Sequence, residues 1–316
     1  MTTVITESVQ NSIDFIQLWR NLGDDYAAWD RRMPDGAPPE FREGYAAGQA
    51  KHKIKKSDRF VRKWLQIRYN ALKRERVVDE KVTADFLKEI DVPICPVTLI
   101  ELSHSKQTES DWSIDRVNND GAYAPQNLIV ISTKANKAKG AKTFDEVEKL
   151  ALQNSVVEEL EPKEWLRLAV LMQGACAVRT RANLMPMPLV TKIPQNCFRS
   201  EWLQMQHVIH MAASKRSERK KLERWTNHIL DDDERGAKRL SLLIDTVGGL
   251  GKETKYEYDV WATTKVKRLF VDWLRQLSPH RQLAFRQTAR NLAGGHAIQD
   301  SEIEAMKLDL HGRLPK

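Results

Sequence analysis

The sequence lacks the features of a membrane or secreted protein. No segment holds the 18 or more consecutive apolar residues of a membrane-spanning helix. Its first residues, MTTVITESVQNSIDF, have neither a basic region nor a continuous apolar stretch, which argues against a secretory signal. The three cysteines are scattered and form no CxxC pair, which argues against a disulfide framework and a four-thiolate zinc site. We therefore expect an intracellular, cytoplasmic protein.

Positive charge is in mild excess and is unevenly distributed. The chain has 51 Lys and Arg against 43 Asp and Glu, a net charge of +8. Between Lys51 and Arg76 there are eleven basic residues and only two acids. Such a block is suited to neutralising nucleic-acid phosphates, and a solvated helix face is the alternative. The candidate DNA-contacting residues of this block are Lys55, Lys56, Arg59, Arg62 and Lys63.

Hydrophobic spacing predicts helices along most of the chain. The segment 29–50 is rich in proline and glycine and predicts a loop or linker, and a second break is expected at Gly248–Gly251. Ser57 or Asp58 would cap a basic helix. The predicted helices are 12–22, 57–76, 83–90, 143–153, 162–178, 199–230, 233–247, 257–277, 279–293 and 300–310.

Residues 94–140 have a different pattern. Short β-rich runs (PVTLIEL, DWSIDRV and NLIVIS) are separated by Asn, Asp, Gly and Pro, and helical spacing resumes at Thr133. In a hairpin packed on a helix, Asp115, Asn127 and Asn136 would converge on one side. A carboxylate and an amide oxygen are hard ligands suited to Mg²⁺ or Mn²⁺, and such an ion can polarise a scissile phosphate.

The stretch CPVTLIEL…DWSIDRVNNDGAYAPQNLIVISTKANKAKG, from Val92 to about Leu150, resembles the HNH endonuclease family. It is most similar to the phage and mobile-element branch with a Cys-Pro pair, an S-I-D-R core and a G-Y-x-P-x-N turn. The resemblance implies a ββα-metal fold that acts on DNA, compatible with phage encoding in a bacterial host. It also implies that Asp115 and Asn136 bind the metal ion and that Asn127 braces the loop.

Arg116 departs from the commonest family pattern, in which a histidine at this position activates water. A guanidinium stays protonated and cannot accept that proton, although it can grip a phosphate oxygen. Three interpretations stay open: another group such as His104 acts as the base, metal-bound water reacts without a side-chain base, or the module binds DNA without cutting it. An exposed loop histidine is the alternative role of His104.

Further basic and histidine residues add candidate sites. Lys134, Lys137 and Lys139 flank Asn136 and are expected to face phosphates, with a solvated helix face as the alternative. On a predicted helix, His207 and His210 have a spacing that can share a metal ion, but a pair of core histidines is the simpler interpretation. The basic run KRSERKKLER at 215–224 extends the DNA contact or forms a solvent-facing stripe.

The sequence as a whole predicts a mostly α protein with a small ββα-metal (HNH) module, α+β overall. Its predicted parts are a basic helical region (1–92), the module (93–150) and a helical region of no recognised family (151–316). The predicted function is metal-dependent endonucleolytic hydrolysis of DNA phosphodiester bonds. The alternatives are a DNA-binding or regulatory protein with a catalytically idle module, and a structural or assembly protein that has acquired one.

Overall fold

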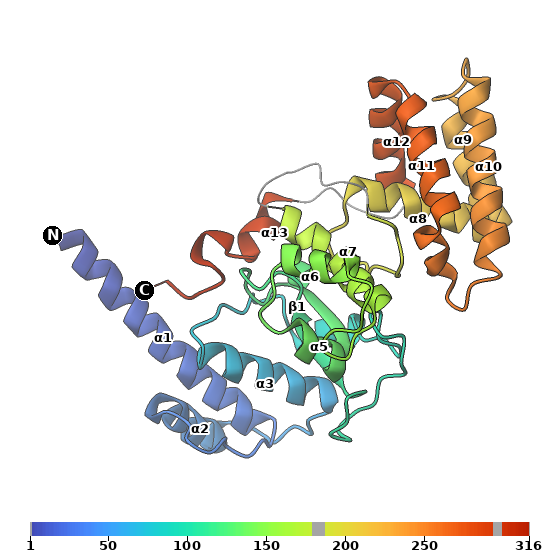
Figure 1. Ribbon diagram of the computed structural model, residues 1–316. Coiled ribbons are helices and arrows are strands. Elements are labelled where there is room, and N and C mark those ends of the chain that lie inside the picture. Colours follow the sequence, from blue (N-terminus) through green and yellow to red (C-terminus); the bar gives the residue numbers. More distant parts are fainter. Residues whose placement is uncertain (1, 179–186, 293–298, 316) are drawn as a thin grey trace. The chain divides into compact units, whose positions relative to one another are not determined.

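The computed structural model describes residues 2–178, 187–292 and 299–315, with side chains from residue 14 onward (Figure 1). The fold is mostly helical with one small two-stranded antiparallel sheet, as the sequence predicts. Two compact units make up the chain. Unit 1 consists of Met1–Asp91, Asn119–Leu128 and Asp300–Lys316, and unit 2 consists of Val92–Asn118 and Ile129–Gln299.

These units differ from the three-part division expected from the sequence. The first expected boundary, near residue 92, coincides with a boundary between the units. The expected 93–150 module, in contrast, contributes its segment Asn119–Leu128 to unit 1, and the C-terminal segment Asp300–Lys316 also belongs there. The reason is non-local pairing: the amide of Ala122 donates to the carbonyl of Met306 at 2.7 Å.

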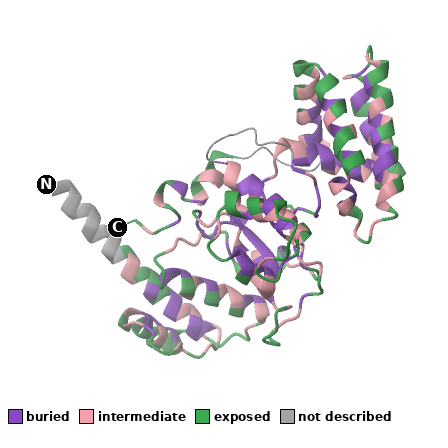
Figure 2. Ribbon diagram, in the orientation of Figure 1, coloured by how far each residue is buried: buried purple, intermediate pink, exposed green. Residues whose placement is uncertain are grey.

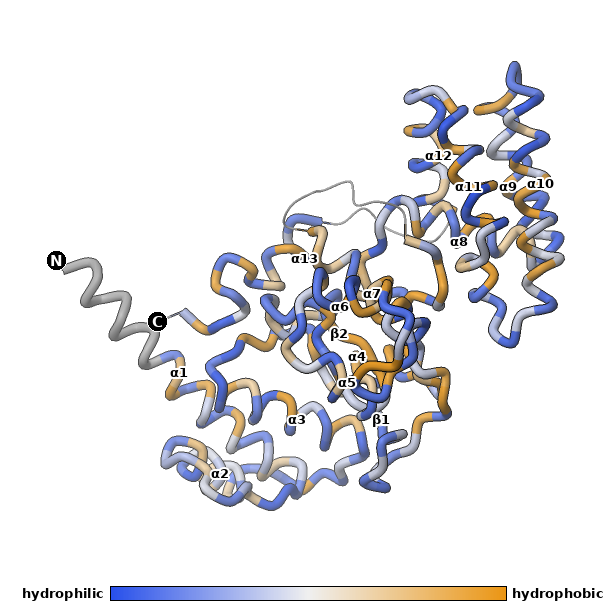
Figure 3. Tube along the Cα trace, in the orientation of Figure 1, coloured by the Kyte–Doolittle hydropathy of each residue, from blue (hydrophilic) through white to orange (hydrophobic). Residues whose placement is uncertain are grey.

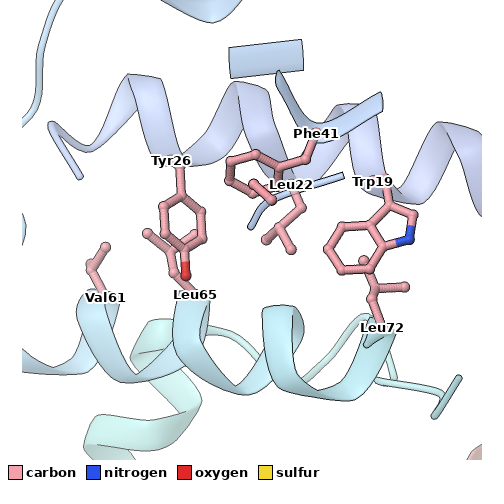
Figure 4. Packing of buried hydrophobic residues seen from close by; sticks show 8 residues of the cluster. Trp19, Leu22, Tyr26, Phe41, Val61, Leu65 and Leu72 are labelled. Carbon is pink, nitrogen blue, oxygen red and sulfur yellow. The ribbon is translucent and has the colours of Figure 1, made fainter. Parts of the chain in front are cut away.

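Unit 1 is built around a helical core. Figure 4 shows Tyr26 of α1 above Leu65 of α3 and Trp19 of α1 above Leu72, with Phe41 of α2 between them. The rings pack edge to face, with centroids 5.1 Å apart for Tyr26 and Phe41. The elements of unit 1 are α1 (Thr2–Ala28), α2 (Pro39–Lys51), α3 (Arg59–Leu72), α4 (Ala84–Glu89), η1 (Pro125–Asn127), α13 (Asp300–Ala305) and η3 (Leu308–Leu310).

The prediction of a loop over 29–50 is wrong for its second half, which forms α2. Pro39 stands in the first turn of this helix. Amide hydrogens in the first turn have no acceptor within the helix, so the absence of one in proline costs no hydrogen bond. Gly44 allows α2 to pack closely on α1, because a Cβ atom there would lie 1.9 Å from the carbonyl oxygen of Arg20. Proline and glycine therefore start and pack this helix instead of breaking it.

The basic helix predicted at 57–76 is confirmed as α3, although it ends at Leu72. Asp58 caps it, since its Oδ1 accepts hydrogen bonds from the amides of Phe60 and Val61 at 2.9 and 2.8 Å. Its buried face joins the core of unit 1, so its charged residues are carried on the remaining surface (Figure 2).

Unit 2 contains the sheet except for Leu128, the first residue of β2, which belongs to unit 1. Every residue of β2 is buried, and this strand is among the most hydrophobic parts of the chain (Figure 3). The run PVTLIEL is a turn, not a strand, closed by a single bridge between Ile94 and Glu101. The elements of this part are β1 (Trp112–Arg116), β2 (Leu128–Ser132), α5 (Thr133–Lys139), α6 (Phe144–Leu152) and α7 (Pro162–Ala177).

The rest of unit 2 is a set of packed helices. The helix predicted at 199–230 is interrupted at Lys215, whose backbone is extended (φ −136°, ψ 124°). The helix end predicted at Gly248–Gly251 is found at Gly251, because α10 continues through Gly248 and Gly249 before it stops. Among the described residues, no helix is long and apolar enough to cross a membrane. The elements are α8 (Glu201–Ser214), α9 (Arg216–Asn227), α10 (Glu234–Gly251), η2 (Glu257–Ala262), α11 (Thr264–Gln276) and α12 (Pro279–Leu292).

Candidate functional site

The candidate site lies where α5 packs on β1 in unit 2. Successive strand residues point to opposite faces, so Ser113 and Asp115 share a face of β1. Ser132 caps α5 by accepting a hydrogen bond from the amide of Ala135 at 3.2 Å, which starts the helix directly after β2. Asn136 and Lys139 are one turn apart on α5 and both contact this face of β1.

Lys139 forms a buried ion pair with Asp115. Its ammonium nitrogen lies 3.1 Å from Oδ2 and 3.4 Å from Oδ1 of the carboxylate, and it donates a hydrogen bond of 2.8 Å to the carbonyl of Arg116. The Lys139 side chain is fully buried, with 0% of its surface exposed. Burial raises the pKa of Asp115, and the charges of Lys139 and Arg116 act in the opposite direction.

This geometry corrects the expected role of Lys139, which was predicted to face DNA phosphates. A fully buried ammonium that neutralises a carboxylate cannot contact a phosphate backbone from this position. The signal was present in the sequence. Ala135, Ala138 and Lys139 lie at helical spacing on one face of α5, and all three are buried. Lys139 therefore occupies a position of the apolar stripe.

The residues around Asp115 fit a divalent cation poorly. One observation favours a cation: Oδ2 of Asp115 is buried and receives no well-directed hydrogen bond. However, the Lys139 ammonium already lies 3.1 Å from that oxygen, where its charge would repel a metal ion. No group of three His, Cys, Asp or Glu side chains suited to a metal ion occurs in the described part of the chain. The expected Mg²⁺ or Mn²⁺ site thus contains an internal cation.

Asn136, the second predicted metal ligand, is also engaged. Its Nδ2 donates a hydrogen bond of 2.8 Å to the Oγ of Ser113, which orients the amide along β1. Sequence reasoning missed Ser113, although its place two residues before Asp115 puts both side chains on one strand face. The structure therefore links Asn136 to Ser113 and Asp115 to Lys139 as two parallel contacts between α5 and β1.

Asn127 is fully buried in unit 1. Its Nδ2 donates a hydrogen bond of 2.8 Å to the carbonyl of Ala122, which ties the two ends of a short loop together. Gly121 leaves the space for this side chain, because a Cβ atom there would lie 2.7 Å from the Asn127 amide nitrogen. The contact is of the loop-bracing kind that the family resemblance implies for this residue.

His104, the predicted candidate base, lies against Trp112. The ring centroids are 5.5 Å apart with an interplanar angle of 73°. Trp112 and Asp115 are three residues apart on β1, so their side chains point to opposite faces of the strand. His104 therefore packs on the face away from the Asp115 carboxylate, and this arrangement gives it no role in proton transfer there.

The other predicted DNA-contacting residues differ in exposure. Lys55, Lys56, Arg62 and Lys137 are exposed, whereas Lys63 and Lys134 are partly buried. Arg59 is engaged within unit 1, where it forms a 2.5 Å ion pair with Asp91.

Of the histidine pair of α8, His210 is buried and His207 is partly buried. The His210 ring is buried and stacks on Tyr258 with centroids 4.2 Å apart, and its Nε2 lies 3.6 Å from a carboxylate oxygen of Glu257. Burial lowers the pKa of both His207 and His210. Glu201, at the start of the same helix, pairs with Arg286 and Arg290 of α12.

No protein-family model, no curated protein and no solved structure matches this chain.

Proposed function

We propose that the protein binds DNA and that its ββα segment is a catalytically idle relative of the HNH nuclease module. The observation that carries this proposal is the position of the Lys139 ammonium, 3.1 Å from the carboxylate oxygen of Asp115. In the nuclease interpretation that carboxylate would hold a divalent metal ion. With an internal cation in its place, the segment keeps a stable hairpin and helix without the chemistry of cleavage.

The residues that would move a proton also support an idle module. Arg116 stands where the family commonly has a histidine, and its guanidinium cannot accept a proton from water. His104 packs on Trp112, on the strand face opposite Asp115. Neither side chain is placed to act as a general base beside this carboxylate, and general-base catalysis requires hydrogen-bond reach.

DNA affinity is assigned to the basic segment Lys51–Arg76 of unit 1. Arg59 and Arg68 are held by Asp91 and Asp25 within the unit. Other basic side chains of the segment are exposed and can contact phosphates. A DNA duplex presents these phosphates at regular spacing. The exposed basic residues are Lys51, Lys53, Lys55, Lys56, Arg62, Lys73 and Arg74.

The test combines a binding and a cleavage assay on the full chain. We expect wild-type protein to bind a DNA duplex at low salt and to leave supercoiled plasmid intact with Mg²⁺ or Mn²⁺. A chelator should leave the binding unchanged. The double substitution Lys55→Gln with Lys56→Gln should weaken binding and lower the slope of affinity against salt by about 2, because two phosphate contacts are lost. Lys238→Gln, at an exposed lysine of α10, is the matched control.

Two outcomes would decide for the alternatives. Plasmid nicking that is lost in Asp115→Ala would establish the metal-dependent nuclease and overturn the idle module. Absence of DNA binding at low salt would favour the structural or assembly role.

A further inference from the structure

The helix α9 carries an exposed tryptophan within a basic surface. Trp225 has 47% of its surface exposed, and it is the one aromatic residue of Phe, Tyr or Trp type that falls in the exposed class within the described residues. Leu222 and Thr226 of the same helix are buried, and α9 packs on α8. The indole thus lies on the outer part of a helix whose inner part is already packed.

The neighbours of Trp225 on this face are basic. Lys221, Trp225 and His228 are spaced by four and three residues, which places them on one side of α9. Arg224 and Lys220 are one turn apart and lie about 100° and 140° around the helix from Trp225, so their long side chains flank this side of α9. We call Lys220, Lys221, Arg224, Trp225 and His228 the α9 basic face.

The acidic residues of α9 leave much of this charge unneutralised. Glu223 pairs with Arg219 at 3.0 Å, and Glu218 is 3.9 Å from Lys221. Within the described residues, Lys220 and Arg224 form no ion pair with any carboxylate. Their charges and an accessible indole are therefore available together to a ligand.

We propose that the α9 basic face binds single-stranded nucleic acid, with an unpaired base stacked on Trp225 and the flanking phosphates on Lys220, Lys221 and Arg224. An aromatic platform set among basic side chains is how proteins hold single strands, because every base has a π face and every linkage a negative charge. In a duplex both faces of each base are covered by its neighbours, and exposing one costs a few kcal/mol.

The segment Lys51–Arg76 differs in this respect. Its Phe60 is buried, and its Trp64 is covered by the guanidinium of Arg68, 4.5 Å from the ring centroid. That segment offers charge without an open aromatic ring, which suits the phosphates of a duplex. The inference rests on the proposed function only in requiring that the protein binds nucleic acid.

The experiment measures binding of the full chain to a fluorescent oligothymidylate and to a DNA hairpin duplex by anisotropy. We expect Trp225→Ala to weaken binding of the single strand by between about 5- and 150-fold, the loss of one stacked base, with little effect on the duplex. Trp225→Phe should retain part of the affinity. Leu242→Ala removes an apolar side chain of similar exposure, 52%, on α10 and should change neither affinity.

The charged part of the face is tested separately. Lys220→Gln with Arg224→Gln should weaken single-strand binding and lower its salt slope by between about 1 and 2. Since these side chains are exposed, the unfolding temperature should stay within a few degrees of wild type, which separates loss of binding from loss of folding.

Several results would overturn the inference. One is an unchanged single-strand affinity in Trp225→Ala, and another is an equal loss in Leu242→Ala. A third is binding of phosphatidylserine vesicles that depends on Trp225 while single-strand binding does not. In each case duplex binding by the wild type would leave the proposed function standing, whereas a wild type that binds neither nucleic acid would refute both.

Discussion

The buried pair of Lys139 and Asp115 is the residue-level feature that decides the interpretation of the site. Bringing both charges out of water is costly, and their attraction offsets that cost only while both are present. The ammonium also donates a hydrogen bond to the carbonyl of Arg116, so its removal would take a donor away from two buried acceptors. The pair therefore joins α5 to β1, and removing either residue alone would leave a buried charge without its counterion.

Removing one partner should be more damaging than removing both. We expect Lys139→Ala to reduce the free energy of unfolding by about 3–5 kcal/mol, because it strands the Asp115 carboxylate in the interior. The double substitution Lys139→Met with Asp115→Leu keeps the volume without the charges and should cost much less. Urea unfolding of the three proteins measures the difference, and an equal or larger loss in the double variant would contradict this account.

The partly buried imidazole of His207 should make the stability of the fold depend on pH in the acid range. Burial, then the charges of Arg199, His210 and Lys192, lower its pKa from 6.5 to about 4. The folded state therefore takes up the proton less readily than the unfolded state. Neutral His207 makes its full contribution to the free energy of unfolding above pH 6.5. This contribution, about 3 kcal/mol, is lost as the pH falls toward 4.

The measurement is the pH dependence of unfolding by urea between pH 4 and pH 7. His207→Gln should flatten this dependence, since the amide does not titrate. His280→Gln, at an exposed histidine of α12, should leave it as in wild type. Curves of equal slope for wild type and His207→Gln would show that this imidazole does not set the acid sensitivity.

The site was only partly predictable from residues. The strand positions of Asp115 and Arg116 and the helix position of Asn136 follow from local pattern, and the structure places them on those elements. The partner of Asp115 was not predicted, because lysine is rarely buried and its basic neighbours suggested contact with phosphates or solvent. The stripe of Ala135, Ala138 and Lys139 contained the necessary information.

At the scale of elements, helices and their caps were the most predictable features. The Asp58 cap of α3 is confirmed, and the helix predicted at 143–153 begins with a capping box of Thr143 and Glu146 as α6. Glycine was the least reliable indicator of a helix break, because its effect on a helix depends on which atoms pack against it. Gly44 sits against a carbonyl of α1, whereas a Cβ atom at Gly249 would meet nothing within 4 Å. Local sequence does not distinguish these two environments.

This contrast gives a matched pair of substitutions in helices. Gly44→Ala should destabilise unit 1, because the new methyl group would overlap the Arg20 carbonyl and force α1 and α2 apart. Gly249→Ala should stabilise α10 by up to about 1 kcal/mol, since alanine has the higher helix propensity and the space is open. Thermal unfolding gives the sign of each effect, and a loss in both variants would contradict the packing argument.

At the scale of the whole molecule, the set of chain segments that form unit 1 could not be predicted from the sequence. Its segments are joined by backbone contacts between residues far apart in the chain. The amide of Val77 donates to the carbonyl of Gly312, and that of Leu314 to the carbonyl of Glu75, each at 2.9 Å. Backbone groups are common to all residues, so such pairings leave no local pattern in the sequence.

The C-terminal segment should therefore support the N-terminal helices. We expect deletion of residues 300–316 to reduce the stability of unit 1 by at least about 2 kcal/mol, because it removes the buried Met306 as well as these backbone bonds. Amide hydrogen exchange in α3 is the measurement, with the exposed Asp309→Ala as the control. Unchanged exchange in α3 after the deletion would contradict this dependence.

Because unit 1 needs residues from 300 onward, its completion comes late during synthesis. The ribosome makes α1, α2 and α3 first, yet their companion segment emerges only after every residue of unit 2 has been translated. The basic segment Lys51–Arg76 would then reach its final setting only after unit 2 has had time to fold. A released chain that ends at residue 299 should consequently carry a protease-resistant unit 2 and an N-terminal region that proteases still cut.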